Sequence, residues 1–125
     1  MSVPSHLSAE PFCNLTTRGR VAGRPHRIEI WFALNGETLY VLSGGRERSD
    51  WVKNLRRTPE VTVKLGHETF AGHARIVDDP DEDERARALV HKYAGSYGGD
   101  LTRWLRSALP VAFDGGNDTT EGGSR

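Results

Sequence analysis

The residue types best suited to bind a ligand lie in an arginine- and glycine-rich turn near the start of the chain. Residues 18–25 read RGRVAGRP and separate two stretches with the alternating pattern of β-strands. Backbone N–H groups and guanidinium groups in such a turn can together hold a phosphate or another oxyanion. A solvent-exposed hairpin connection is the simpler interpretation, because arginine is common in turns of that kind.

A second glycine-rich turn strengthens the anion-binding interpretation. Residues 43–46 read SGGR, and Ser49 or Asp50 is suited to cap a helix a few residues later. The N-terminus of a helix beside a glycine-rich loop presents N–H groups to anions. Two such turns in the first half of the chain favour a cofactor phosphate site, although they do not identify the cofactor.

Charge is balanced over the whole chain and unbalanced around the two turns. The 125 residues, enough for one domain, carry 17 basic and 17 acidic side chains. This balance argues against nucleic-acid binding, which usually requires net positive charge. Between Arg18 and Arg57, nine Lys or Arg face four Asp or Glu, a local excess of five positive charges. A small anionic ligand fits this distribution better than a polyanion.

Metal chemistry and hydrolysis have little support in the sequence. The five histidines show no metal-ligand spacing, so we expect no metal site. The single cysteine, Cys13, cannot form an internal disulfide, which favours a reducing compartment. Neither Cys13 nor Ser43 has the sequence context of an activated nucleophile.

The sequence contains no apolar run of membrane-spanning length and no signal-peptide pattern. We therefore expect a cytoplasmic protein without stable insertion into a membrane.

The apolar pattern predicts a small antiparallel barrel of about six strands with peripheral short helices. Strands are expected over residues 12–17, 26–34, 37–43, 60–65, 69–77 and 110–113. Helices are expected from Ser49 or Asp50 to Pro59, from about residue 78 to Gly95, and over residues 101–109. Asn35-Gly36 indicates a type I′ hairpin between the second and third strands. We expect a flexible arm over residues 1–10, one cofactor-binding domain over 11–113, and a disordered tail over 114–125.

Several aromatic residues lie close to the two turns in the sequence. Trp31 and Trp51 are more typical of a core, but their positions also allow stacking on a flat ring system. Tyr93 and Tyr97 flank a glycine-containing loop, which is compatible with a mobile lid or with an ordinary helix end.

Two motifs together resemble those of a known enzyme family. Residues 15–25 follow the pattern LTTxGRxxGxP, and residues 51–63 follow WxxNLxxxPxVxV. This combination resembles the deazaflavin-dependent nitroreductase or quinone reductase family over about residues 12–113. The resemblance implies a split β-barrel related to flavin-reductase and pyridoxamine-phosphate-oxidase-like barrels. It also implies the coenzyme F-420, a deazaflavin whose reduced form donates hydride to quinones, nitro compounds or unsaturated rings.

The same resemblance implies which residues bind the coenzyme. They lie in the first turn, the strand after it, the second turn and the following helix: Arg20, Val21, Ala22, Gly23, Arg24, His26, Trp31, Ser43, Gly44, Gly45, Trp51 and Asn54. Arg20 and Arg24 would hold the phosphate and the acidic tail, while Trp31 and Trp51 would shape the ring pocket. Tyr97 is a candidate proton donor, with solvent as the alternative.

The sequence therefore predicts an oxidoreductase that transfers hydride from a reduced deazaflavin to a small-molecule electron acceptor. Two alternatives remain open at this point. The same barrel can use FMN, whose single phosphate the same turns would hold, or it can be a non-catalytic carrier of a flavin-like or acyl ligand. The sequence is compatible with a monomer and with a homodimer.

Overall fold

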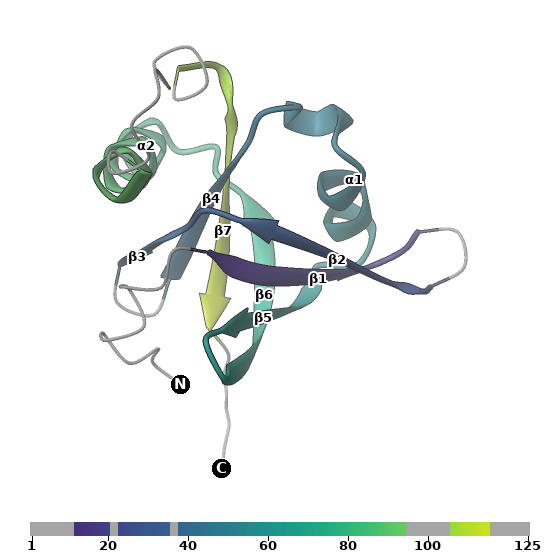
Figure 1. The fold of residues 1–125 in the computed structure, drawn as a ribbon. Helices are drawn as coiled ribbons and strands as arrows, with labels where there is room; N and C mark the ends of the chain where they lie inside the picture. Colours follow the sequence, from purple (N-terminus) through teal and green to yellow (C-terminus); the bar gives the residue numbers. More distant parts are fainter. Residues whose placement is uncertain (1–11, 21–22, 36–37, 95–105, 116–125) are drawn as a thin grey trace.

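One antiparallel sheet runs through the computed structural model, which describes residues 12–20, 23–35, 38–94 and 106–115 (for 92–94 and 115, the backbone alone). Within these residues, seven strands follow the order β2-β1-β5-β6-β7-β4-β3 and curl into a split barrel (Figure 1). The strands are β1 Cys13–Arg18, β2 Pro25–Ile30, β3 Ala33–Asn35, β4 Thr38–Ser43, β5 Glu60–Leu65, β6 Glu68–Ile76 and β7 Leu109–Gly115. The helices are the short 3-10 helix η2 Arg46–Arg48 and the α-helices α1 Asp50–Arg57 and α2 Pro80–Ala94. The predicted fold class is confirmed.

The sheet is curled because its two edge strands, β2 and β3, follow each other directly along the chain. We predicted one strand over residues 26–34, and this prediction was wrong. Ile30 still pairs with Cys13 in β1, whereas Ala33 already pairs with Tyr40 in β4. Only Trp31 and Phe32 separate the two pairings, so the chain crosses there from one edge of the sheet to the other. The apolar alternation continues through this crossing because Phe32 is buried in the core.

Two other predictions differ from the structure in detail. Asn35 pairs with Thr38 as a strand residue, so the predicted turn position of Asn35 was wrong, and residues 36 and 37 lie outside the described residues. The predicted last helix ends before Leu109, which begins β7, and β7 includes Asp114 and Gly115, which we had assigned to the tail. Residues 1–10 and 116–125, the expected arm and most of the expected tail, lie outside the described part of the chain.

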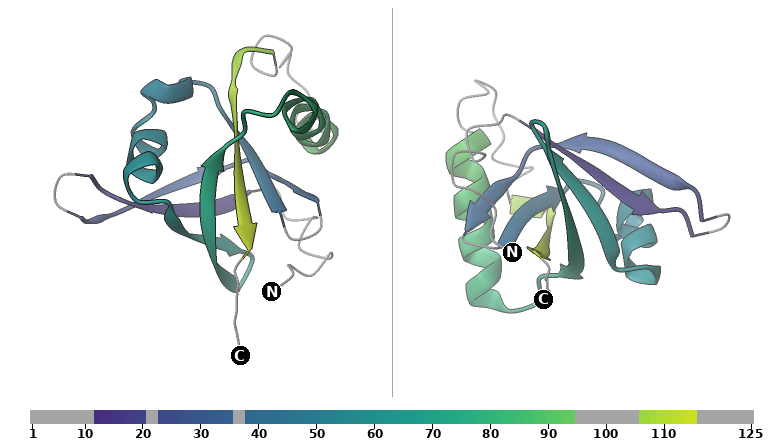
Figure 2. Two further views of the ribbon diagram at one scale, coloured as in Figure 1. Left: turned by 180° about the vertical axis from the view of Figure 1, so that it is seen from behind. Right: turned by 90° about the horizontal axis from the view of Figure 1, so that it is seen from below.

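The two α-helices cover different sides of the barrel (Figures 1 and 2). Inside the curl, the main core includes Leu55 of α1 together with side chains from β1, β4, β5, β6 and β7. A second core lies between α2 and the other face of β4, where Val90 packs with Tyr40 and Leu42. β4 is therefore buried on both faces, which explains why its sequence lacks the alternation of a half-exposed strand.

A group of charged side chains fastens α2 to the sheet. Arg75 of β6 donates from Nη1 and Nη2 to the two carboxylate oxygens of Glu82, each at 2.7 Å, and from Nε to Oδ2 of Asp114 at 2.8 Å. Tyr40 donates its hydroxyl hydrogen to Oε2 of Glu82 at 2.7 Å. The hydrogen bonds from Arg75 and then from Tyr40 lower the pKa of Glu82 from 4.5 to about 2.

The lowered pKa of Glu82 predicts a specific loss of stability in acid. A carboxylate with a depressed pKa in the folded state contributes stability above pH 4.5, and this contribution disappears as the pH falls toward 2. We expect Glu82→Gln to lower the free energy of unfolding by roughly 2–3 kcal/mol at pH 7. The difference from the wild type should shrink between pH 4.5 and 2 in urea denaturation curves.

Glu84→Gln is the matched control for this experiment, because Glu84 is an exposed residue of the same helix. This variant should follow the wild type at every pH. A difference between wild type and Glu82→Gln that stayed constant with pH would contradict the prediction.

Candidate functional site

The first turn has a backbone conformation that requires glycine at two positions. The N–H of Gly19 donates to the carbonyl oxygen of Arg24 at 2.7 Å, and the N–H of Gly23 donates to that of Gly19 at 2.9 Å. A Cβ at Gly19 would lie 3.0 Å from the oxygen of Arg24, and Gly23 has a φ of +70°. The glycines therefore shape the turn, while Val21 and Ala22, two predicted cofactor contacts, lie outside the described residues.

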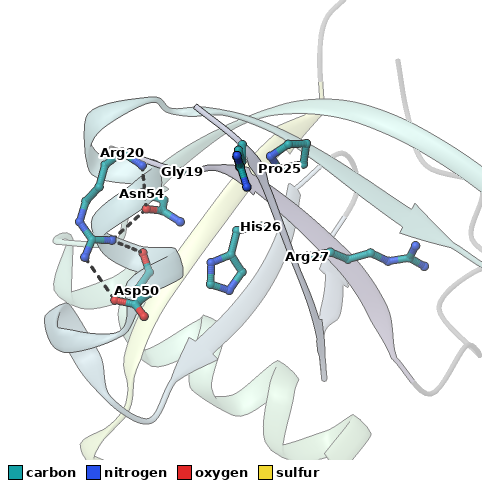
Figure 3. A pocket seen from close by; sticks show the side chains of 8 residues that line it. Gly19, Arg20, Pro25, His26, Arg27, Asp50 and Asn54 are labelled. Carbon is teal, nitrogen blue, oxygen red and sulfur yellow. Dashed lines mark hydrogen bonds and ion pairs between the residues drawn. The ribbon is translucent and has the colours of Figure 1, made fainter. Parts of the chain in front are cut away.

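A pocket of about 530 Å³ opens between this turn, the start of β2 and helix α1 (Figure 3). We call it the basic pocket; its lining residues are Gly19, Arg20, Arg24, Pro25, His26, Arg27, Asp50 and Asn54. In Figure 3 the His26 side chain lies on the same side of β2 as Asp50 and Asn54, whereas Arg27 extends away from them. The pocket combines three arginines with one carboxylate, so its net charge is positive.

Arg20 does not project freely into the basic pocket. Its Nη1 donates to Oδ1 of Asn54 at 3.0 Å and to the backbone oxygen of Asp50 at 3.5 Å. Its Nη2 forms an ion pair with Oδ1 of Asp50 at 3.3 Å, and its backbone N–H donates to Oδ1 of Asn54 at 3.3 Å. Arg20 therefore fastens the first turn to α1, a role that the sequence analysis did not anticipate.

The side chain of Asn54 is at the centre of a buried polar chain. Asn54 and Thr17 are only 2% and 1% exposed, and Nδ2 of Asn54 donates to Oγ1 of Thr17 at 3.2 Å. The Thr17 hydroxyl in turn donates to the backbone oxygen of His26 at 3.4 Å. One amide thus connects α1, β1, β2 and the first turn. The sequence motif predicted Asn54 as a site residue, but it did not indicate that Thr17 and Asp50 belong to the same hydrogen-bond network.

The second turn is organised by its serine hydroxyls. Ser43 donates from Oγ to the backbone oxygen of Arg46 at 3.0 Å and lies 2.8 Å from Oγ of Ser49. Ser49 precedes α1 but makes no side-chain capping bond to it. A Cβ at Gly45 would lie 2.5 Å from Oγ of Ser49, so a larger residue there would move this hydroxyl away from Ser43. Arg46 has a φ of +52°, and its Nη1 donates to the backbone oxygen of Ser107 at 2.6 Å.

A second pocket, of about 290 Å³, lies beside this turn. We call it the aromatic pocket; its lining residues are Phe12, Glu29, Ile30, Trp31, Leu42, Ser43, Gly44 and Trp51. Of the predicted site residues, it contains Trp31, Ser43, Gly44 and Trp51. Phe12 is the large hydrophobic residue that is exposed among those described, and the sequence analysis did not assign it to the site.

The two pockets lie along the same pair of elements. β2 contributes His26 to the basic pocket and Ile30 to the aromatic pocket, and α1 contributes Asn54 to the first and Trp51 to the second. Four residues of a strand span roughly 13 Å. The predicted site residues therefore lie in a cationic end and an aromatic end, which are about 13 Å apart along β2.

The remaining predicted site residues either line neither pocket or, like Val21 and Ala22, lie outside the described residues. Among the described residues, Gly23 and Gly45 line neither of the two pockets and act through turn geometry. Tyr97, the candidate proton donor, lies outside the described part of the chain.

Within the described ranges, no three His, Cys, Asp or Glu side chains are grouped so that they could hold a metal ion. Burial raises the pKa of the Cys13 thiol to about 12, which keeps it protonated and unreactive at neutral pH. None of the helices that the structure describes is long and apolar enough to cross a membrane.

The buried polar chain predicts that Asn54→Ala destabilises the protein. The substitution removes the acceptor for two Arg20 donors and the donor to Thr17, which should cost roughly 2–3 kcal/mol in the free energy of unfolding. Lys53→Ala changes an exposed neighbour on the same helix and serves as the control. Urea denaturation compares the two variants, and equal effects of both would show that the network contributes little.

Comparisons with known proteins identify the family and the fold. The model of the family described as F420H(2)-dependent quinone reductase matches residues 2–114. A search of curated proteins finds no match.

Similar solved structures include a conserved hypothetical protein from Mycobacterium tuberculosis, with a TM-score of 0.73 and 21% identity over 90% of this chain and 78% of that one. An F420-H2-dependent reductase gives a TM-score of 0.68 and 18% identity over 83% and 94% of the two chains. A putative pyridoxamine 5′-phosphate oxidase from Listeria innocua gives a TM-score of 0.67 and 20% identity over 90% of each chain. At these identities the structures establish the split-barrel fold alone, whereas the family match covers nearly all of the described chain. The protein therefore belongs to the F420H(2)-dependent quinone reductase family, a family of oxidoreductases.

Proposed function

We propose that this protein binds the reduced coenzyme F-420 across the basic and aromatic pockets and directs its hydride to a quinone, nitro or unsaturated small molecule. The observation that carries the proposal is the arrangement of the two pockets along β2 and α1. A ligand that joins an anionic tail to a planar ring matches this order of a cationic end and an aromatic end.

At the cationic end, Arg24 is the best candidate for direct contact with the phosphate or the acidic tail. Arg20 is already bonded to Asn54 and Asp50. Arg24 and Arg27 are exposed, and among the described residues neither has an ion-pair partner. Guanidinium groups without a protein partner are available to a phosphate or carboxylate in a bidentate geometry.

At the aromatic end, Trp51 is buried, Trp31 is half-buried and Phe12 is exposed. Flat aromatic side chains stack on a ring system and exclude water from it. The coenzyme, when bound, supplies the hydride, and the protein supplies binding, orientation and a dry pocket. Tyr97 remains the candidate proton donor, with solvent as the alternative.

FMN is the main alternative ligand, because its ring and single phosphate suit the same two pockets. A non-catalytic carrier of a flavin-like or acyl ligand is the alternative from another functional class. For assembly, both a monomer and a homodimer stay under consideration, since one solved structure with a TM-score of 0.69 and 17% identity is described as a domain-swapped dimer.

Titration and turnover with purified protein test these alternatives directly. We expect saturable binding of F-420, weaker binding of FMN, and oxidation of reduced F-420 when menadione is added. Tight FMN binding without F-420 binding would overturn the coenzyme assignment. F-420 binding without turnover on quinone, nitro or unsaturated acceptors would instead favour the carrier.

A single substitution tests the proposed role of Arg24. Arg24→Ala should weaken F-420 binding by roughly tenfold or more, because a charge-assisted contact to an anionic group is lost. Arg85→Ala is the control: Arg85 is an exposed arginine on α2, on another side of the barrel (Figure 1). Fluorescence titration gives both dissociation constants, and equal values for Arg24→Ala and the wild type would refute the assignment.

A further inference from the structure

Asp50 is a carboxylate inside a pocket whose other charged side chains are arginines. It is the acidic side chain among the described residues that line the basic pocket, and it is 66% exposed. A negative charge at this position opposes the binding of an anion through like-charge repulsion. The position of Asp50 in the first turn of α1 suits the helix dipole but is unfavourable for attracting a phosphate.

The carboxylate of Asp50 is not needed to hold Arg20 in place. Asn54 accepts from both the backbone N–H and Nη1 of Arg20, at 3.3 and 3.0 Å. The backbone oxygen of Asp50 accepts from Nη1 at 3.5 Å, and this contact does not depend on the identity of the side chain. Only the contact from Nη2 to Oδ1, at 3.3 Å, depends on the carboxylate. Figure 3 shows Arg20 reaching over Asn54 to Asp50 in this way.

We propose that Asp50 competes internally with the anionic ligand for Nη2 of Arg20 and thereby sets the affinity of the basic pocket for anions. Without ligand, the carboxylate occupies this donor; when an anionic group enters the pocket, it replaces the carboxylate on Arg20. For F-420 as the ligand, the inference rests on the proposed function. The competition itself concerns any phosphate-type anion in the basic pocket.

Internal competition lowers the affinity for every anion, so at a given concentration only ligands that make further contacts still occupy the pocket. A small anion that reaches only Arg20 must displace Asp50 and then lies beside its charge. A larger ligand that also contacts Arg24 or the aromatic pocket gains interactions that Asp50 does not oppose. Asp50 thus acts against non-specific occupation of the pocket by abundant small anions.

A double-mutant cycle on Asp50 and Arg20 tests the proposal. Asp50→Asn keeps the shape of the side chain and removes its charge, so we expect F-420 and inorganic pyrophosphate to bind roughly three- to tenfold more tightly. In the Arg20→Ala background, the same Asp50→Asn change should give a clearly smaller gain, because the relief of charge repulsion remains but the donor for which Asp50 competes is absent. Asp78→Asn, an equal charge change at an exposed residue between β6 and α2, should have no effect on affinity.

The two probes separate this proposal from the proposed function. Pyrophosphate affinity is measured by its protection against thermal unfolding, which requires neither F-420 nor turnover. If F-420 fails to bind while Asp50→Asn still tightens pyrophosphate binding in an Arg20-dependent way, the coenzyme assignment fails and the role of Asp50 stands. Unchanged or weaker pyrophosphate binding by Asp50→Asn, no binding by either protein, or an equal gain without Arg20 would each overturn it.

Discussion

The geometry of the site depends on one buried amide, the side chain of Asn54. Its oxygen accepts from Arg20 in the first turn, and its nitrogen donates to Thr17 in β1. A buried amide is costly unless both ends are paired, so the turn, the strand and the helix must adopt one relative position to satisfy it. The two pockets are defined by that position, because each lies between β2 and α1.

This network divides the arginines of the first turn into two groups. Arg20 bonds to Asn54 and Asp50 and stabilises the site, whereas Arg24 has no ion-pair partner among the described residues. We predicted the same role for both residues from the sequence. The motif shows that both positions carry a positive charge, but it does not show which residue each arginine contacts. The partners, Asn54 and Asp50, lie 34 and 30 residues away along the chain. Contacts of this range arise from the fold and cannot be inferred from local patterns.

Local features of the sequence were sufficient for most elements of the fold. Pro59 after α1, Gly66-His67 between β5 and β6, and the acidic start of α2 each specify a boundary through their own backbone or charge preferences, and the observed elements agree. The predictions failed at Trp31-Phe32 and at Leu109. The alternation of apolar residues continues through the crossing between β2 and β3, because Phe32 is buried in the core although it pairs with neither β1 nor β4. The apolar pattern therefore does not show where the strand changes its partner. Leu109 belongs to a strand whose partners, β4 and β6, no local pattern identifies.

The position of β7 has a consequence for how the chain can fold. Among the described residues β7 is the last strand along the chain, yet it lies between β4 and β6 and pairs Thr38 with Asp114 across 76 residues. Until β7 has left the ribosome, β4 and β6 each present an open edge and the second core lacks Ala112. Such non-local closure is slow compared with the formation of local hairpins. Nascent chains that lack β7 therefore leave β4 and β6 with unpaired edges, and the synthesis of β7 removes this risk of aggregation.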